Sequence, residues 1–117
     1  MVRVFFDIES TGLLPEGQIT CAVTQAGEDV RTWVSQGEKE NTYSLMTTEK
    51  ANELVEYLYS FSEGKNVVTF NGASFDFKML KKHLDDEMMI EKLLVIAKNH
   101  FDLHLACIES AGHRMAL

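Results

Sequence analysis

Asp7 and Glu9, near the start of the chain, are spaced so that they could hold a divalent cation. In an extended strand, residues two apart point to the same face, so these carboxylates would lie about 7 Å from each other. Two carboxylates in an apolar setting repel each other, and one of them tends to stay protonated. A divalent cation relieves this repulsion, and Mg²⁺ prefers carboxylate oxygens. The pair therefore indicates a metal site, with a simply solvated strand end as the alternative.

A third carboxylate, Asp76, follows a second apolar strand. The run Asn66–Phe70 is short and apolar, and Asn71–Phe75 leads from it into a helix that has Asp76 near its N-terminus. The helix dipole favours a negative charge at that end, which would explain Asp76 without any ligand. If the two strands are neighbours, however, Asp76 approaches Asp7 and Glu9. The three acids then predict one cation pocket.

A period of two predicts the strand that positions the first two acids. Val2, Val4, Phe6 and Ile8 fall on one face, whereas Phe5 shares the other face with the acids. Nearly every position before Asp7 is apolar or β-branched, which is typical of a central strand covered on both faces. We therefore expect this strand to lie in the middle of a sheet.

Two further strands should complete an antiparallel meander with the first. Ile19, Cys21 and Val23 alternate with small or polar residues and predict one strand, and Val30–Val34 predicts the next after a short turn. The polar stretch Ser35–Ser44 predicts a solvated surface loop. The strand with the acids stands at the start of this meander, with one edge open to a further neighbour.

Helical spacing of apolar residues predicts four helices between and after these strands. Thr47 or Thr48 should cap the first helix, and the short strand after it should return parallel to the first strand by a right-handed crossover. The carboxyl ends of both strands then meet, where open α/β sheets bind ligands. The third helix should bury Leu93 and Leu94 on its apolar side. The predicted helices cover residues 47–62, 76–83, 85–97 and 103–110, with an extended piece at 99–102.

The whole chain has the size of one domain, residues 1–117, and its composition bounds what it binds. Eighteen acids against 11 bases give a net charge of −7, which argues against a protein that holds nucleic acid through basic stripes. Nucleic acid at a metal site is compatible with this charge, because the cations supply the positive charge. No apolar run approaches the ~18 residues of a membrane span, so no membrane partner is expected. Cys21 and Cys107 form no metal motif, which suits a reducing cytoplasm.

Two segments that carry the acids resemble motifs of the DEDD (DnaQ-like) 3′–5′ exonuclease superfamily. Phe6–Leu13 resembles its first motif and Asn71–Asp76 its second, while Phe101–Leu105 is similar to a segment that usually precedes the third. The similarity runs from Val2 to the C-terminus. It implies an α/β, ribonuclease H-like fold with a mixed five-stranded sheet: a three-stranded antiparallel meander plus parallel strands, with flanking helices.

The resemblance also implies a site and a substrate. Asp7, Glu9 and Asp76 would be the catalytic residues and would bind two Mg²⁺ or Mn²⁺ ions about 4 Å apart. The substrate would be the 3′ end of single-stranded DNA or RNA. Ordinary core packing is the alternative for two of the implied substrate contacts, at positions 13 and 75. The implied substrate contacts are Ser10, Thr11, Gly12, Leu13, Asn71 and Phe75.

The chain departs from this family at its C-terminal end. The family has a fourth carboxylate in a third motif on a C-terminal helix, and no Asp follows Asp102 here. We expect that helix to be missing and the second ion to bind weakly. His104 and Glu109 have the spacing of a replacement pair, on a helix whose inner face would carry Leu105 and Ile108. The auxiliary candidates are Asp102, His104, Glu109 and, as a base, His113.

Three functions follow from these expectations. The first is a metal-dependent 3′–5′ exonuclease, either weak or completed by a partner. The second is a truncated, catalytically impaired exonuclease fold that acts as a protein-binding inhibitor or regulatory subunit. In the third, the three acids are structural only. Because each face of a sheet needs a covering layer, the missing helix predicts an exposed apolar patch, which a second copy of the chain or a protein partner would cover.

Overall fold

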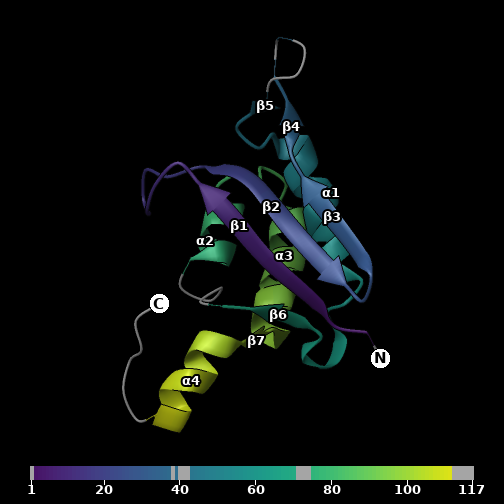
Figure 1. The fold of residues 1–117 in the computed structure, drawn as a ribbon. Coiled ribbons are helices and arrows are strands. Elements are labelled where there is room, and N and C mark those ends of the chain that lie inside the picture. Colours follow the sequence, from purple (N-terminus) through teal and green to yellow (C-terminus); the bar gives the residue numbers. More distant parts are fainter. Residues whose placement is uncertain (1, 38, 40–42, 71–74, 112–117) are drawn as a thin grey trace.

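The computed structural model describes residues 2–37, 39, 43–70 and 75–111, with the backbone alone for 108–111. Its centre is a five-stranded sheet with the order β3-β2-β1-β6-β7 (Figure 1). The prediction of a mixed five-stranded sheet is therefore confirmed. The strands are β1 (Val4–Ser10), β2 (Ile19–Ala26), β3 (Asp29–Trp33), β6 (Val67–Thr69) and β7 (Phe101–Asp102).

The pairing of the strands places the acid-bearing strand at the centre. β1 pairs antiparallel with β2, and β2 pairs antiparallel with β3, so the predicted meander is confirmed. β6 pairs with β1 in parallel, with Val4 opposite Val67 and Phe5 opposite Val68. β7 lies parallel to β6 on its far side, with Asp102 opposite Thr69. The carboxyl ends of β1, β6 and β7 therefore share one edge of the sheet.

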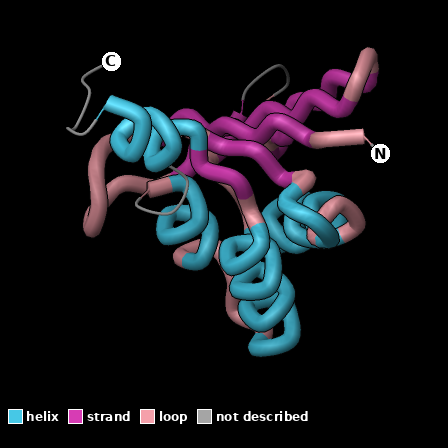
Figure 2. Tube along the Cα trace, turned by 90° about the horizontal axis from the view of Figure 1, so that it is seen from below, coloured by secondary structure: helices cyan, strands magenta, loops and turns pink. Residues whose placement is uncertain are grey.

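The core lies on one face of β1 only. Val4, Phe6 and Ile8 are buried, as the period of two predicts, and the opposite face carries the exposed residues Phe5 and Asp7. Val2, predicted on the buried face, is 56% exposed because it lies before the start of β1. Phe5 is 52% exposed, so the expectation of a strand covered on both faces is wrong. Figure 2 shows the physical reason, because the helices between β3 and β7 all pack on the same side of the sheet.

The alternation in β2 is shifted relative to the prediction. Ala22 and Thr24 are buried together with Ile19, whereas Val23 is 40% exposed. The pairing with β1 shifts between Glu9 and Ser10, because Glu9 faces Cys21 while Ser10 faces Ile19. Such a bulge inserts one unpaired residue and exchanges the two faces of the strand beyond it. The predicted grouping of positions 19, 21 and 23 on one face is therefore wrong.

Three helices form the layer under the sheet, and a fourth follows β7 at its edge (Figures 1 and 2). Thr47 caps the first of them, because its side chain accepts a hydrogen bond from the Lys50 amide at 3.2 Å. In α3, Leu93 is buried as predicted, but Leu94 is 55% exposed and Ile96 takes its place in the core. The helices are α1 (Thr48–Tyr59), α2 (Asp76–Lys81), α3 (Glu87–Asn99) and α4 (Leu103–Ala111), with a short 3₁₀ turn at Glu63–Lys65.

The segment predicted as a loop between β3 and α1 contains a short ladder. β4 (Ser35–Gln36) pairs antiparallel with β5 (Tyr43–Ser44), so the loop prediction for 35–44 is wrong at both ends. The Ser35 hydroxyl accepts a hydrogen bond from the Thr47 amide at 2.9 Å and ties the ladder to the start of α1. A two-residue ladder of polar residues leaves no hydrophobic period in the sequence, which is why the pattern missed it.

Candidate metal and nucleic-acid site

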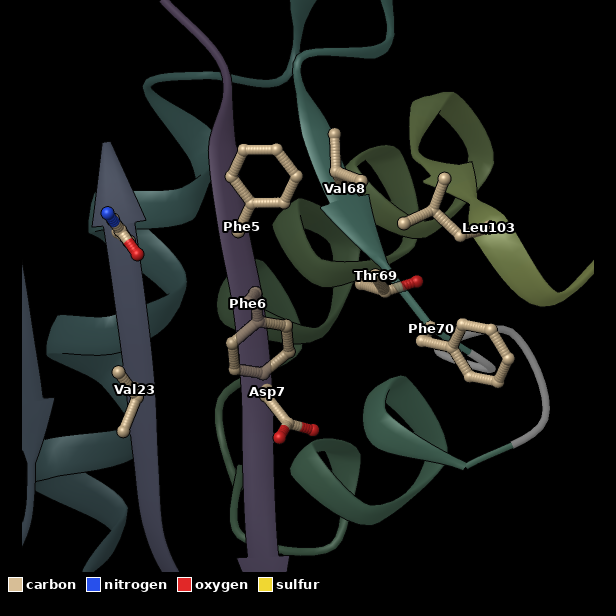
Figure 3. A pocket seen from close by; sticks show the side chains of 9 residues that line it. Phe5, Phe6, Asp7, Val23, Val68, Thr69, Phe70 and Leu103 are labelled. Atoms are coloured by element: carbon tan, nitrogen blue, oxygen red, sulfur yellow. The ribbon is translucent and has the colours of Figure 1, made fainter. Parts of the chain in front are cut away.

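Asp76 is the buried acid of the site. It is the first residue of α2, it is 3% exposed, and its Oδ2 atom is buried without a hydrogen-bond partner. Burial, together with the negative charges of Asp7 and Asp102, raises the pKa of Asp76 to about 7. The parallel pairing of β1 with β6 therefore brings Asp76 within electrostatic reach of Asp7. Figure 3 shows Asp7 pointing from β1 towards the side of β6.

Glu9 lies two residues beyond Asp7 on the same exposed face of β1. Among the residues that the structure describes, no group of three or more His, Cys, Asp or Glu side chains is close enough to hold one metal ion. A single ion bound by all three predicted acids therefore requires movement of their side chains. The part of the site that does fit a cation is the Asp7–Asp76 pair, because a cation would satisfy the unpartnered Asp76 oxygen and offset the raised pKa.

Asp102, one of the auxiliary candidates from the sequence, adds its charge to this acidic pair from β7. It is buried, and its Oδ1 atom accepts a hydrogen bond from the His104 amide at 2.9 Å, which caps the start of α4. Its Oδ2 atom is 4.0 Å from Nε2 of His100, and that ring packs edge-on against Phe77 with the ring centroids 4.7 Å apart. Asp102 thus combines a structural cap with a negative charge beside Asp76.

His104 has a different environment from the one predicted. It is buried, and its ring lies 5.0 Å from the ring of Phe70, whereas Leu105 is 46% exposed. The predicted inner face of this helix is therefore wrong at Leu105, because the Asp102 cap starts α4 in a phase that turns His104 inward. The side chains of Glu109 and Ile108 lie outside the described residues. So do His113 and Asn71 entirely.

The end of β1 and the loop after it hold four of the six residues predicted to bind substrate, Ser10–Leu13. The Ser10 hydroxyl donates to the Gly12 carbonyl at 2.8 Å, and the Thr11 amide donates to the Gln18 carbonyl at 2.9 Å. Leu13 is 78% exposed, which excludes the alternative of core packing for this side chain. Phe75, by contrast, is half-buried and packs against the core next to Asp76.

Gly17 closes this loop onto Gly12. A Cβ atom at Gly17 would lie 2.1 Å from the Gly12 carbonyl oxygen, so no other residue fits there without moving the backbone. The Gly17 amide also donates to the Leu13 carbonyl at 2.8 Å. The loop is therefore a closed, hydrogen-bonded turn that presents Leu13 to solvent.

The residues that follow α2 form hydrogen bonds with the same loop and with the start of β2. The Lys82 ammonium donates to the carbonyls of Pro15, at 2.6 Å, and Gly17. Nε2 of His83 accepts from the Ile19 amide at 2.9 Å, so its Nδ1 carries the proton and donates to the Met46 carbonyl at 2.8 Å. Burial lowers the pKa of His83, and the charge of Lys82 lowers it further. No motif in the sequence marks this contact, since its members lie more than 60 positions apart.

We expect His83→Ala to destabilise the fold by about 2 kcal/mol, because it leaves the Ile19 amide without its partner. A lowered pKa means that the folded state prefers neutral His83, so its contribution is present above pH 6.5 and falls as the pH drops. The variant should therefore lose less stability than the wild type between pH 7 and pH 5. Urea unfolding at both pH values measures this, with the exposed Lys78→Ala as control. Equal losses in both proteins would contradict the assignment.

An apolar hollow of about 600 Å³ adjoins Asp7 on the open face of the sheet (Figure 3). It places one carboxylate at the end of a surface made mostly of aromatic and aliphatic side chains. Such a surface suits a flat, partly apolar group that carries a charge at one end. The lining residues are Phe5, Phe6, Asp7, Val23, Gln25, Val68, Thr69, Phe70 and Leu103.

A family model described as RNase H superfamily matches residues 4–117. No curated protein matches the chain. No helix among the described residues is long and apolar enough to cross a membrane. The match covers β1, β6, β7 and the helix that begins at Asp76, and it indicates a nuclease-type activity.

Proposed function

Because the chain belongs to the RNase H superfamily and has its α/β fold, we propose that it is a metal-dependent 3′–5′ exonuclease of the DEDD (DnaQ-like) type. Its substrate would be the 3′ end of single-stranded DNA or RNA. The observation that carries the proposal is the buried, unpartnered oxygen of Asp76 within electrostatic reach of Asp7. Asp7 comes from β1 and Asp76 from the start of α2, so two segments distant in sequence would each contribute a carboxylate to this chemistry.

Asp7, Glu9 and Asp76 would hold the Mg²⁺ or Mn²⁺ ions. A bound ion would supply positive charge for the phosphate and a water of lowered pKa for hydrolysis. Because the pKa of Asp76 is raised to about 7 without metal, cation binding would displace a proton from it near neutral pH. The net charge of −7 makes the ions the source of attraction for the phosphate.

The substrate would enter over the open face of the sheet. Leu13, exposed at the tip of the loop after β1, would contact the terminal nucleotide, with the hydrogen-bonded turn Ser10–Gly12 beside it. Phe70 and the hollow around it offer apolar surface for a base, since bases stack on aromatic side chains. Phe75 packs against the core, so it would support the start of α2 and its acid rather than reach far into solvent.

The test is a directional assay under single-turnover conditions, with the protein in excess over single-stranded DNA or RNA labelled at its 5′ end. We expect a ladder of products shortened stepwise from the 3′ end in Mn²⁺ and no products in EDTA. A substrate with a phosphorothioate at its last linkage should stay intact. Cleavage that is internal, or equal with and without metal, would contradict the proposal.

A second candidate function is a catalytically impaired fold that binds another protein as an inhibitor or regulatory subunit. Two observations favour it: no three-ligand group exists among the described residues, and the sheet has an open, apolar face. Calorimetry with Mn²⁺ separates the two functions. Binding that disappears in the Asp76→Asn variant favours the nuclease, whereas no binding at millimolar Mn²⁺ favours the second function.

A further inference from the structure

The exposed face at the start of β1 carries a positive and a negative side chain on either side of an aromatic one. Arg3 lies just before β1, and Phe5 and Asp7 follow it at every second position, so this surface is positive, apolar and negative in turn, with Phe5 at its centre. Arg3 and Phe5 line one hollow, and Phe5 and Asp7 line the next. Both hollows are also lined by Val68 and Leu103, so they adjoin each other along β1 and β6, and together they are called the trough below.

This trough lies at the middle of the sheet, where a covering layer is normally found. β1 has β2 on one side and β6 on the other, yet Phe5 is 52% exposed and Leu103 is 40% exposed. Figure 2 shows α1, α2 and α3 together on the opposite face. An apolar surface of this kind on a central strand marks a contact site, because its exposure to water is unfavourable.

We propose that this face joins two copies of the chain through a twofold axis that passes between their Phe5 side chains, at right angles to β1. Such an axis turns the second β1 antiparallel to the first and stacks Phe5 on its own copy. Strand geometry places Arg3 and Asp7 each about 7 Å from Phe5, on opposite sides, so each Arg3 faces Asp7 of the second copy. Sheets that pack face to face are about 10 Å apart, a distance that an Arg and an Asp side chain bridge together.

The neighbouring strands agree with the same axis. Phe5 pairs with Val68 of β6 and with Gln25 of β2, so the axis also relates these positions to their own copies, although Val68 is itself buried within each chain. One is apolar and the other uncharged, so neither creates a repulsive contact on the axis. A twofold contact needs this self-complementary order, whereas a contact with an unrelated protein does not.

The net charge of the chain also favours a dimer in which opposite charges of the two copies meet. Two chains of net charge −7 repel each other, so a stable contact needs a positive group of one copy on an acid of the other. Arg3 and Asp7 provide two such contacts per dimer. The inference does not depend on the proposed nuclease. If both hold, the dimer covers Asp7 and closes the candidate site.

Sedimentation over a concentration series, in EDTA and without nucleic acid, tests the proposal. We expect the wild type to dimerise with concentration. Arg3→Asp and Asp7→Arg should each raise the dissociation constant by about tenfold or more, because each replaces two attractive contacts by two repulsive ones. The double variant Arg3→Asp/Asp7→Arg exchanges the partners and should restore the dimer.

Matched controls are Lys98→Asp and Asp85→Arg, which reverse exposed charges on α3 and before it. They should leave the dissociation constant unchanged. Circular dichroism and thermal unfolding show whether each variant is folded, as expected for exposed positions. A wild type that stays monomeric at every concentration overturns the proposal. So does a double variant that associates no better than the single variants, because the face would then have another occupant.

Discussion

Without metal, Asp76→Asn is expected to stabilise the folded chain by up to about 4 kcal/mol at pH 8. The folded state raises the pKa of Asp76 from 3.8 to about 7, so the unfolded chain releases this proton first as the pH rises. Stability is therefore lost between pH 4 and pH 7 and stays at the lower level above pH 7. Asparagine carries no charge at any pH and removes the whole loss.

Urea unfolding in EDTA at pH 4, 6 and 8 measures this effect as the difference between the variant and the wild type. The difference should be small at pH 4 and should grow with pH, which separates it from every group that titrates equally in both proteins. Asp85→Asn, at an exposed position, is the matched control. A difference that is the same at pH 4 and pH 8 would show that folding does not raise the pKa of Asp76.

The second large effect is expected from Asp7→Asn, which should lower the Mn²⁺-dependent rate of nucleotide release by about a hundredfold or more. Asp7 is the acid that lies within electrostatic reach of Asp76 and also borders the apolar hollow, so it connects the ion site with the substrate surface. The measurement is the single-turnover rate with a 5′-labelled single strand. Asp29→Asn, at an ion pair on β3, should retain the wild-type rate.

The same variant has a readout that needs no activity. Removing the negative charge of Asp7 should bring the pKa of Asp76 down towards its usual range, which NMR titration of the Asp76 carboxyl measures. An unchanged rate would contradict the role of Asp7 in catalysis. An unchanged Asp76 pKa would contradict its place beside Asp76, whatever the activity is.

Local patterns in the sequence were sufficient for most of the fold. The period of two in β1 put Asp7 and Glu9 on one face, and the helix before β6 required the parallel pairing that brings Asp76 near. Thr47 was identified as a cap from its position before the apolar helix spacing. These features depend on neighbours in the chain or on chirality rules that hold for nearly all α/β sheets.

The features that failed depend on contacts between distant residues. The bulge opposite Glu9 exchanges the faces of β2, and nothing in the alternation of β2 itself reveals it. His104 turns inward because Asp102 caps α4, and the charge of Asp102 reaches Asp76 only because β7 lies beside β6. The spacing of apolar residues alone cannot show which side of α4 faces inward, because this short helix has apolar residues on all sides.

α2 has two tasks although it is only six residues long. Its first residue, Asp76, belongs to the acidic pair. Just beyond its last turn, Lys82 donates to the Pro15 carbonyl and His83 accepts from the Ile19 amide, at the end of the loop that presents Leu13. A helix this short cannot bend to absorb a displacement, so a change in the length of that loop would shift the acid at the other end. Insertions between Thr11 and Gln18 should therefore be far less tolerated than insertions at the β2–β3 turn, which has no such link to the acids.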